Sequence, residues 1–223
     1  MKKIGLLLLL AATAWAQGPY LSLSAGFAVP TGDFAAQRPN ADVGFAKIGF
    51  TGGAEFDLMT GLDGLAWSSA LFYLANDYES STFSQGLEMD LYETGAYGAV
   101  SAMTGLKWYK PLGESVSFFL LSRIGLASIK GPFLSGIPKA STSYEIVEFQ
   151  MNRSNSFAYA FGLGMVFNQR TYLGLHWLNA GRAGFSKEVA YTLGNTRRTA
   201  QVGWDTPVNL LVVTVGYSID FSE

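Results

Sequence analysis

The stretch VNLLVVTVGYSIDFSE, residues 208–223, has a two-residue period. From Leu211 every second residue is apolar: Leu211, Val213, Val215, Tyr217, Ile219 and Phe221. The residues between them become small or polar toward the end: Thr214, Gly216, Ser218 and Asp220. Because successive side chains of a strand point to opposite faces, this period predicts a strand with one bulky apolar face. That face would form the interior of a soluble sandwich but the lipid-facing exterior of a membrane barrel.

The composition favours one β-rich domain. The chain has 223 residues, of which 26 are Gly and only 14% are charged, as suits many short strands in close contact. It has no Cys, which excludes disulfides and thiolate metal sites. The formal net charge of −2 gives no basic surface for nucleic acid.

The N-terminus is typical of a secretory signal peptide. Lys2 and Lys3 precede an apolar run from Ile4, and Ala14 and Ala16 form an A-x-A cleavage site. We therefore predict a signal peptide at residues 1–16 and a barrel domain at residues 17–223; the alternative is a retained N-terminal anchor. Removing the two lysines leaves 13 basic against 17 acidic residues, a net charge of about −4. No later apolar run approaches the roughly 20 residues of a membrane-spanning helix.

Seven further segments alternate or are apolar enough to form strands. The expected strands run from Tyr20 to Val29, Val43 to Leu58, Leu65 to Ala75, Thr94 to Tyr109, Val116 to Ala127, Phe157 to Phe167, Tyr172 to Leu178, and along the closing stretch. The third of these is apolar on both faces, so its facing stays open.

The connections between these strands alternate in length. Long connections at residues 30–42, 76–93, 130–155 and 181–207 alternate with short ones at 60–64, 110–115 and 168–170. This order predicts an all-β, eight-stranded antiparallel up-and-down transmembrane barrel with short turns on one side and long loops on the other. Residues expected in an aromatic girdle are Tyr20, Trp67, Trp108, Tyr109, Phe167, Tyr172, Trp177 and Phe221. The alternative, an exported lipocalin-like barrel or sandwich, requires the bulky faces inside.

The export signal, GFAVPTGDF (26–34), GLKWYKPLGESVSFFLLSRIGLA (105–127) and the closing strand resemble outer-membrane β-barrel families, the small porin-like barrels akin to OmpA and OmpX. The resemblance spans essentially the whole predicted mature chain. It implies the outer membrane of a Gram-negative-type bacterium, contact with outer-membrane lipid and lipopolysaccharide, and insertion by the barrel-assembly machinery. That machinery commonly reads a terminal aromatic residue, which here is Phe221, two residues from the end. No peptidoglycan-binding domain is expected after the barrel.

His176 is the one histidine, in the string LHWLNAGRAG. The string is similar to the H-x-S-N-x-G stretch of lipid A deacylase barrels, but Leu178 stands where their nucleophilic Ser would be. Without that hydroxyl the Ser–His mechanism fails, so we predict no catalytic residue and interpret His176 as a lumen side chain. One His and no Cys also argue against a metal site.

Two groups of loop charges could bind ions. The carboxylates are Asp63, Asp77, Glu79, Glu88, Asp90 and Glu93, but they lack the D-x-D-x-D-G spacing of a calcium loop. Arg197 and Arg198 could meet lipopolysaccharide phosphates, or could simply be solvated. No cofactor is predicted.

Three functional classes follow. The first is a non-enzymatic structural or surface-interaction barrel that displays four long extracellular loops. The alternatives are a narrow pore or a small-ligand- or lipid-binding barrel, and then a lipid A-modifying enzyme. An eight-stranded interior filled by side chains argues against a wide pore. The sequence does not identify an extracellular partner.

Four charged residues share the small-residue face of their strands: Lys47, Glu55, Lys107 and Arg123. Because an unpaired charge enclosed by a narrow barrel is costly, we predict that they pair into a lumen charge network. Glu55 would lie between basic partners, and Arg123 would offer a two-nitrogen fork. The alternative is that these charges sit at the lumen mouths in water.

Overall fold

The computed structural model describes residues 19–38, 43–79, 89–139, 146–193 and 196–221. The elements are β1 (Tyr20–Thr31), η2 (Gly32–Phe34), β2 (Ala46–Met59), β3 (Leu65–Tyr78), β4 (Met89–Thr94), β5 (Tyr97–Pro111), β6 (Val116–Lys130), β7 (Phe133–Pro138), β8 (Val147–Gln150), β9 (Arg153–Phe167), β10 (Thr171–Leu193) and β11 (Thr196–Asp220). Within these ranges no helix is long and apolar enough to cross a bilayer. The predicted signal peptide lies outside them.

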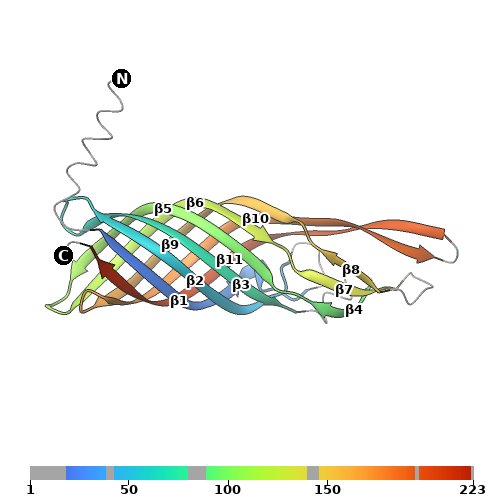
Figure 1. Cartoon of the computed structure of the whole chain (residues 1–223), viewed down its shortest axis with the longest axis horizontal. Coiled ribbons are helices and arrows are strands. Elements are labelled where there is room, and N and C mark those ends of the chain that lie inside the picture. Colours follow the sequence, from blue (N-terminus) through green and yellow to red (C-terminus); the bar gives the residue numbers. More distant parts are fainter. Residues whose placement is uncertain (1–18, 39–42, 80–88, 140–145, 194–195, 222–223) are drawn as a thin grey trace, which may run out of the picture.

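Eight strands close into an antiparallel barrel in the order β1-β11-β10-β9-β6-β5-β3-β2 (Figure 1). Tyr20 pairs with Asp220, so the first strand closes the ring against the last. The predicted eight-stranded barrel is confirmed. The end that holds this pair also holds the connections after β2, β5 and β9, and we call it the short-turn end. The opposite end is the long-strand end.

Positive φ values shape two of the short turns. Between β9 and β10, Asn168 and Gln169 both have positive φ, 50° and 59°, and Arg170 N donates to Phe167 O at 3.1 Å. Two consecutive positive φ values define a type I′ turn, whose twist matches an antiparallel hairpin. In the turn after β2, Gly64 has φ 68°, and a Cβ there would meet Tyr109 O, so only Gly fits.

The bulky faces of the strands point outward. Along β9, Phe157, Phe161, Leu163, Met165 and Phe167 are exposed, whereas Ala158 and Ala160 between them are buried. Ten residue steps of about 3.3 Å, tilted by about 40°, give a height of about 25 Å, that of a lipid-facing apolar band. The soluble alternative, with its bulky faces inside, is therefore wrong.

The structure also decides the facing of β3. Trp67, Leu71 and Tyr73 are exposed on the outside, and Phe72 and Leu74 are buried inside. The lumen therefore holds large apolar side chains as well as small ones.

Two members of the predicted aromatic girdle do not belong to it. Tyr172 is buried inside the barrel, and the Tyr109 hydroxyl donates to the buried Asp57. Both share the inward-facing parity of their strands, which outweighs their position near a strand end.

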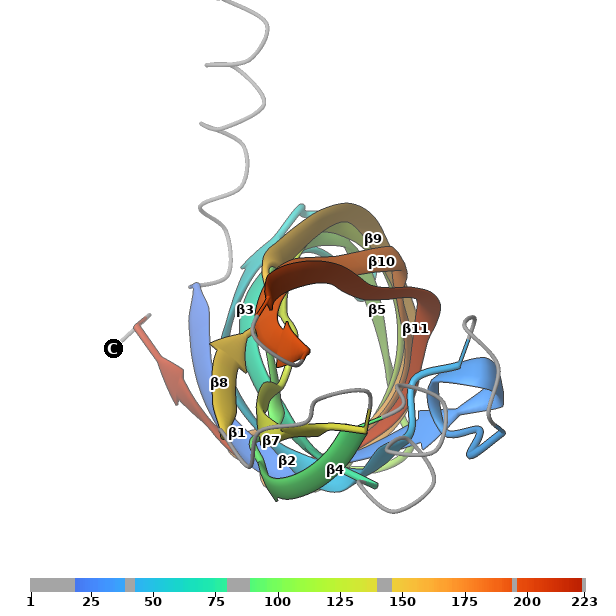
Figure 2. The ribbon, with the colours of Figure 1, turned by 90° about the vertical axis from the view of Figure 1, so that its right-hand side faces the viewer.

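The long-strand end is more ordered than the sequence predicts. Two of the expected long loops contain β4, β7 and β8, which form a separate three-stranded sheet in the order β4-β7-β8. The expected loop at 181–207 is instead a hairpin, because β10 and β11 stay paired from Arg182–Pro207 to Leu193–Thr196 (Figures 1 and 2). Gly181, with φ 74° at a register shift, interrupts the alternation without ending the strand.

Aromatic rings pack together at this end. The aromatic cluster comprises Phe34, Phe45, Tyr78, Tyr97, Phe185 and Trp204. Phe185 connects the hairpin to the barrel, because its ring centroid is 5.6 Å from that of Tyr97 on β5 and 5.4 Å from that of Trp204 on β11. The Tyr97 hydroxyl donates to Gly44 O at 2.8 Å. Buried apolar residues continue from this cluster into the barrel lumen.

Candidate functional site: a charge cluster in the barrel lumen

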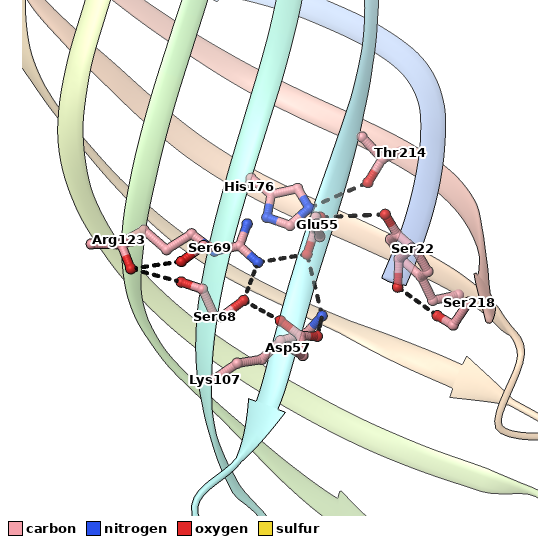
Figure 3. Close-up of polar contacts among 12 residues, drawn as sticks. Ser22, Glu55, Asp57, Ser68, Ser69, Lys107, Arg123, His176, Thr214 and Ser218 are labelled. Atoms are coloured by element: carbon pink, nitrogen blue, oxygen red, sulfur yellow. Dashed lines mark hydrogen bonds and ion pairs between the residues drawn. The ribbon is translucent and has the colours of Figure 1, made fainter. Parts of the chain in front are cut away.

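Strand alternation brings four ionisable side chains into the lumen. Glu55 and Asp57 are two residues apart on β2 and therefore face the same way; Lys107 comes from β5 and Arg123 from β6. All four are 1–2% exposed. We call these four residues the charge cluster (Figure 3).

Glu55 is the centre of the cluster. Its Oε2 accepts from Arg123 Nη2 at 2.5 Å and from Lys107 Nζ at 3.3 Å. Its Oε1 accepts from the hydroxyl of Tyr172, on β10, at 3.3 Å. In the ring, β6 lies three places from β2 in one direction, and β10 lies three places from it in the other. These contacts therefore reach across the lumen.

Asp57 forms the second half of the cluster. Its Oδ2 accepts from Lys107 Nζ at 3.0 Å and from the Tyr109 hydroxyl at 2.6 Å. Its Oδ1 accepts from Ser68 Oγ, which in turn accepts from Arg123 Nη2 at 2.6 Å. Ser68, on β3, therefore links Asp57 to Arg123 (Figure 3).

The charges balance. Two carboxylates face one ammonium and one guanidinium, so the ionised cluster has no net charge. Buried ions are tolerated when they are paired and hydrogen-bonded, and removing one partner leaves an uncompensated charge. Lys107 Nζ also lies 4.5 Å from the centroid of the Phe119 ring, within cation–π range.

Two details differ from the prediction. Arg123 donates to both Glu55 and Ser68 from Nη2, so the expected two-nitrogen fork on Glu55 is not formed. Lys47 lies outside the cluster: its side chain is 47% exposed and pairs with Glu79 at 2.5 Å at the long-strand end. Eight residues, about 26 Å of strand, separate it from Glu55. A register shift between Ala46 and Gly49 displaces it, and Asn76 Nδ2 donates to Lys47 O at 2.9 Å.

The lumen is packed on the long-strand side of the cluster. The space bordered by Arg123, Phe72, Met103, His176 and Leu178 is about 10 Å³, the size of a single water position. On the short-turn side, Lys107, Tyr109 and Tyr172 form part of a vestibule of about 190 Å³. The charge cluster therefore separates this vestibule from the packed interior.

His176 is a buried lumen residue. Its Nε2 lies 3.2 Å from Thr214 Oγ1, and its neighbour on the same face, Leu178, is also buried and has no nucleophilic atom. No group of three or more His, Cys, Asp or Glu side chains is placed to hold a metal ion in the described part of the chain.

The remaining sequence candidates are dispersed. Asp63, Asp77 and Asp90 are exposed, with Asp90 4.0 Å from Lys139. Glu79 pairs with Lys47, whereas Glu88 and the side chain of Glu93 lie outside the described residues. Arg197 and Arg198 are exposed near the tip of the β10–β11 hairpin.

Sequence reasoning missed Asp57, Tyr109, Ser68 and Tyr172 as members of the site. The alternation does place Asp57 with Glu55 and Tyr109 with Lys107. Ser68 and Tyr172 follow only once the facing of β3 and the order of strands around the ring are known.

Comparison with known proteins supports the fold alone. No protein family and no curated protein matches the sequence. The outer-membrane protein OprG from Pseudomonas aeruginosa aligns over 93% of this chain and 99% of its own, with 13% identity and a TM-score of 0.51. Neisserial surface protein A aligns over 92% and 97%, with 13% identity and a TM-score of 0.49. A major outer-membrane protein from Thermus thermophilus aligns over 92% and 100%, with the same identity and TM-score.

The OprG structure is similar to the chain in architecture, with little identity of sequence. The chain has the fold of the small outer-membrane β-barrels, as its resemblance to OmpA and OmpX implies.

Proposed function

We propose that the chain is a non-enzymatic outer-membrane barrel of structural or surface-interaction type, whose lumen is closed to ions. Residues 1–16 direct its export, and residues 17–223 form the barrel domain. The exposed apolar band supports membrane insertion, for which the barrel-assembly machinery is the expected partner, with Phe221 as its recognition residue.

The observation that carries the closed lumen is the charge cluster. Its contacts extend from β2 to β6 and β10, and the lumen beyond it holds a space for about one water. An ion would have to break buried ion pairs to pass. A scaffold that crosses the membrane without conducting accounts for this interior better than a pore does.

A surface role is supported by the long-strand end. The β4-β7-β8 sheet and the β10–β11 hairpin extend beyond the barrel (Figure 1). In the proposed orientation this end, with all four connections, faces the outside of the cell. The exposed polar positions of the hairpin, such as Glu188, Gln201 and Asp205, would be available to a partner there.

Planar-bilayer conductance of the refolded protein tests the closed lumen. We expect no current, or only small flickering events, because the charge cluster blocks a continuous water path. Folding in detergent should give a dominant β signal by circular dichroism and a gel mobility that changes on boiling. Steady ohmic conductance would place the protein among the pores, and a monomer that folds without detergent would contradict membrane insertion.

The absence of enzymatic activity is supported by Leu178. The position that would carry a nucleophile holds an apolar side chain, buried in the lumen beside His176. Incubation with lipid A should leave every acyl chain in place by mass spectrometry. Loss of an acyl chain would contradict the proposal.

A further inference from the structure

The apolar exterior ends in a polar border at the long-strand end. On β6 the outward residues change from Leu126 to Ser128, and then to Lys130 at the end of the strand. On β9 the same change runs from Phe157 to Asn155, and then to Arg153. Lys130 and Arg153 therefore lie four residues beyond the last exposed apolar pair on these strands. That is about 13 Å along the strand and about 10 Å in height for a tilt of about 40°.

Strand register places these two cations side by side. Leu126 pairs with Phe157 and Lys130 pairs with Arg153. Residues directly opposite each other on one face have Cβ atoms about 5 Å apart, and like charges in such a pair are destabilising. Both residues are exposed, and neither forms an ion pair with any residue that the structure describes. Two adjacent positive charges without a counter-charge attract an anion.

The height of the pair indicates which anion. The headgroup layer begins where the apolar band ends, and it extends about 5–8 Å beyond the hydrocarbon on each side. Long Lys and Arg side chains reach into this layer from just above it. Guanidinium and ammonium groups are the usual protein ligands of phosphate.

We propose that Lys130 and Arg153 form a binding site for the phosphate of an anionic lipid headgroup in the leaflet at the long-strand end. The proposal rests on the membrane insertion proposed above. The site does not extend around the barrel to β3, which is two places from β6 in the ring and ends its outward row in the acidic Asp77.

The two arginines that the sequence singles out are less suited to this role. Arg197 and Arg198 are consecutive on β11, so their side chains leave opposite faces of the hairpin. They also lie 11 or more residues, about 35 Å of strand, beyond Asn209, whose Oδ1 accepts from Asn179 Nδ2 at the polar border. They therefore provide a matched control of the same charge.

The binding experiment uses the full barrel in phosphatidylcholine nanodiscs that contain a minor fraction of phosphatidic acid. Native mass spectrometry counts the phosphatidic acid retained by wild type, by the Lys130→Gln/Arg153→Gln variant and by the Arg197→Gln/Arg198→Gln variant. We expect retention to fall about tenfold in the first variant and to stay unchanged in the second. Equal retention in all three proteins, or an equal loss in both variants, would overturn the site.

A charge reversal gives an independent readout. In a non-ionic detergent, Lys130→Glu should raise the unfolding midpoint by about 1–4 °C, because it replaces a repulsive pair with an attractive one. Phosphatidic acid should then stabilise wild type but not this variant. A lowered midpoint for Lys130→Glu would contradict the repulsion on which the site depends.

Two further arms separate the remaining outcomes. Inorganic phosphate in detergent should not reproduce the stabilisation; if it does, the site binds free anions rather than a lipid. Failure of the wild-type protein to float with liposomes would overturn the proposed membrane function. Normal flotation without any preference for phosphatidic acid would overturn only the lipid site.

Discussion

At its two ends the barrel interior is filled by different chemistry. Towards the short-turn end, Glu55, Asp57, Lys107 and Arg123 form a neutral cluster in which each ion has a charged partner. At the long-strand end, the aromatic cluster packs the β10–β11 hairpin against β5 and η2. The charge cluster depends on every member being present, because a buried ion without a partner is costly. In the aromatic cluster, by contrast, the loss of stabilising free energy grows with the number of buried atoms that a substitution removes.

The two regions also differ in how they couple to the rest of the barrel. The charge cluster, with its hydrogen-bond partners Ser68 and Tyr172, joins β2, β3, β5, β6 and β10, five of the eight strands of the ring. The distal part of the hairpin, by contrast, is paired only β10 to β11. A defect in the charge cluster should therefore lower the stability of the whole barrel, whereas a defect in the aromatic cluster should open one end of it.

The largest effect is expected for Glu55→Ala. This substitution removes the shared partner of Lys107 and Arg123 and leaves one uncompensated positive charge in the lumen. We expect a loss of about 3–5 kcal/mol in the free energy of unfolding, measured by urea titration in lipid vesicles. Small ion currents should also appear, because the main contact across the lumen is gone.

Glu79→Ala is the matched control for Glu55→Ala. It also removes a carboxylate from a Lys–Glu pair, but its partner Lys47 is half-exposed. The control should cost no more than about 1 kcal/mol. Equal effects of the two substitutions would mean that the lumen charges are solvated.

The second effect concerns the aromatic cluster. Phe185→Ala removes a ring that contacts both Tyr97 and Trp204. We expect local opening of the hairpin to become easier by about 3 kcal/mol, seen as faster amide exchange at residues 183–190 and 200–206. The midpoint for unfolding of the barrel should change little. A large drop in that midpoint would show that the two ends unfold as one unit.

The third effect separates charge from shape within the charge cluster. Since Arg123 uses only Nη2 toward Glu55 and Ser68, one ammonium group can replace much of its role. Arg123→Lys should therefore cost about 1 kcal/mol in urea unfolding, and the uncharged Arg123→Met about 3 kcal/mol or more. Equal losses would mean that the guanidinium shape matters more than its charge.

The sequence predicts much of the fold because outward and inward residues alternate in most strands. The same alternation places Glu55, Lys107 and Arg123 inside. It fails for Lys47, because a register shift near Gly49 and the distance along β2 are not visible in a pattern of faces. It also misses Ser68 and Tyr172, whose contacts depend on how separate strands align.

The long-strand end is less predictable for a different reason. The strands β4, β7 and β8 are only four to six residues long, in segments rich in Ser, Gly and Pro that otherwise indicate loops. In the sequence, Gly181 indicates the end of a strand, although the alternation resumes after it at Ala183 and Phe185 in β10. The pair of Lys130 and Arg153, 23 residues apart in sequence, exists only through register.

The smallest effect is expected for Lys47→Ala. This substitution compares an exposed ion pair with the buried ion pairs of the charge cluster. The pair of Lys47 with Glu79 is solvated, so its loss should change the free energy of unfolding by less than about 1 kcal/mol. Lys107→Ala removes the same side chain from a buried site, where it pairs with two carboxylates, and should cost about 3–5 kcal/mol. Urea titrations at low salt and at about 1 M salt distinguish the two, because the Debye length falls to about 3 Å at 1 M and salt screens exposed pairs far more than buried ones. The small effect of Lys47→Ala should therefore disappear in high salt, while that of Lys107→Ala persists. If salt removed both effects equally, the lumen would have to be open to water, and the proposal of a closed barrel would fail with it.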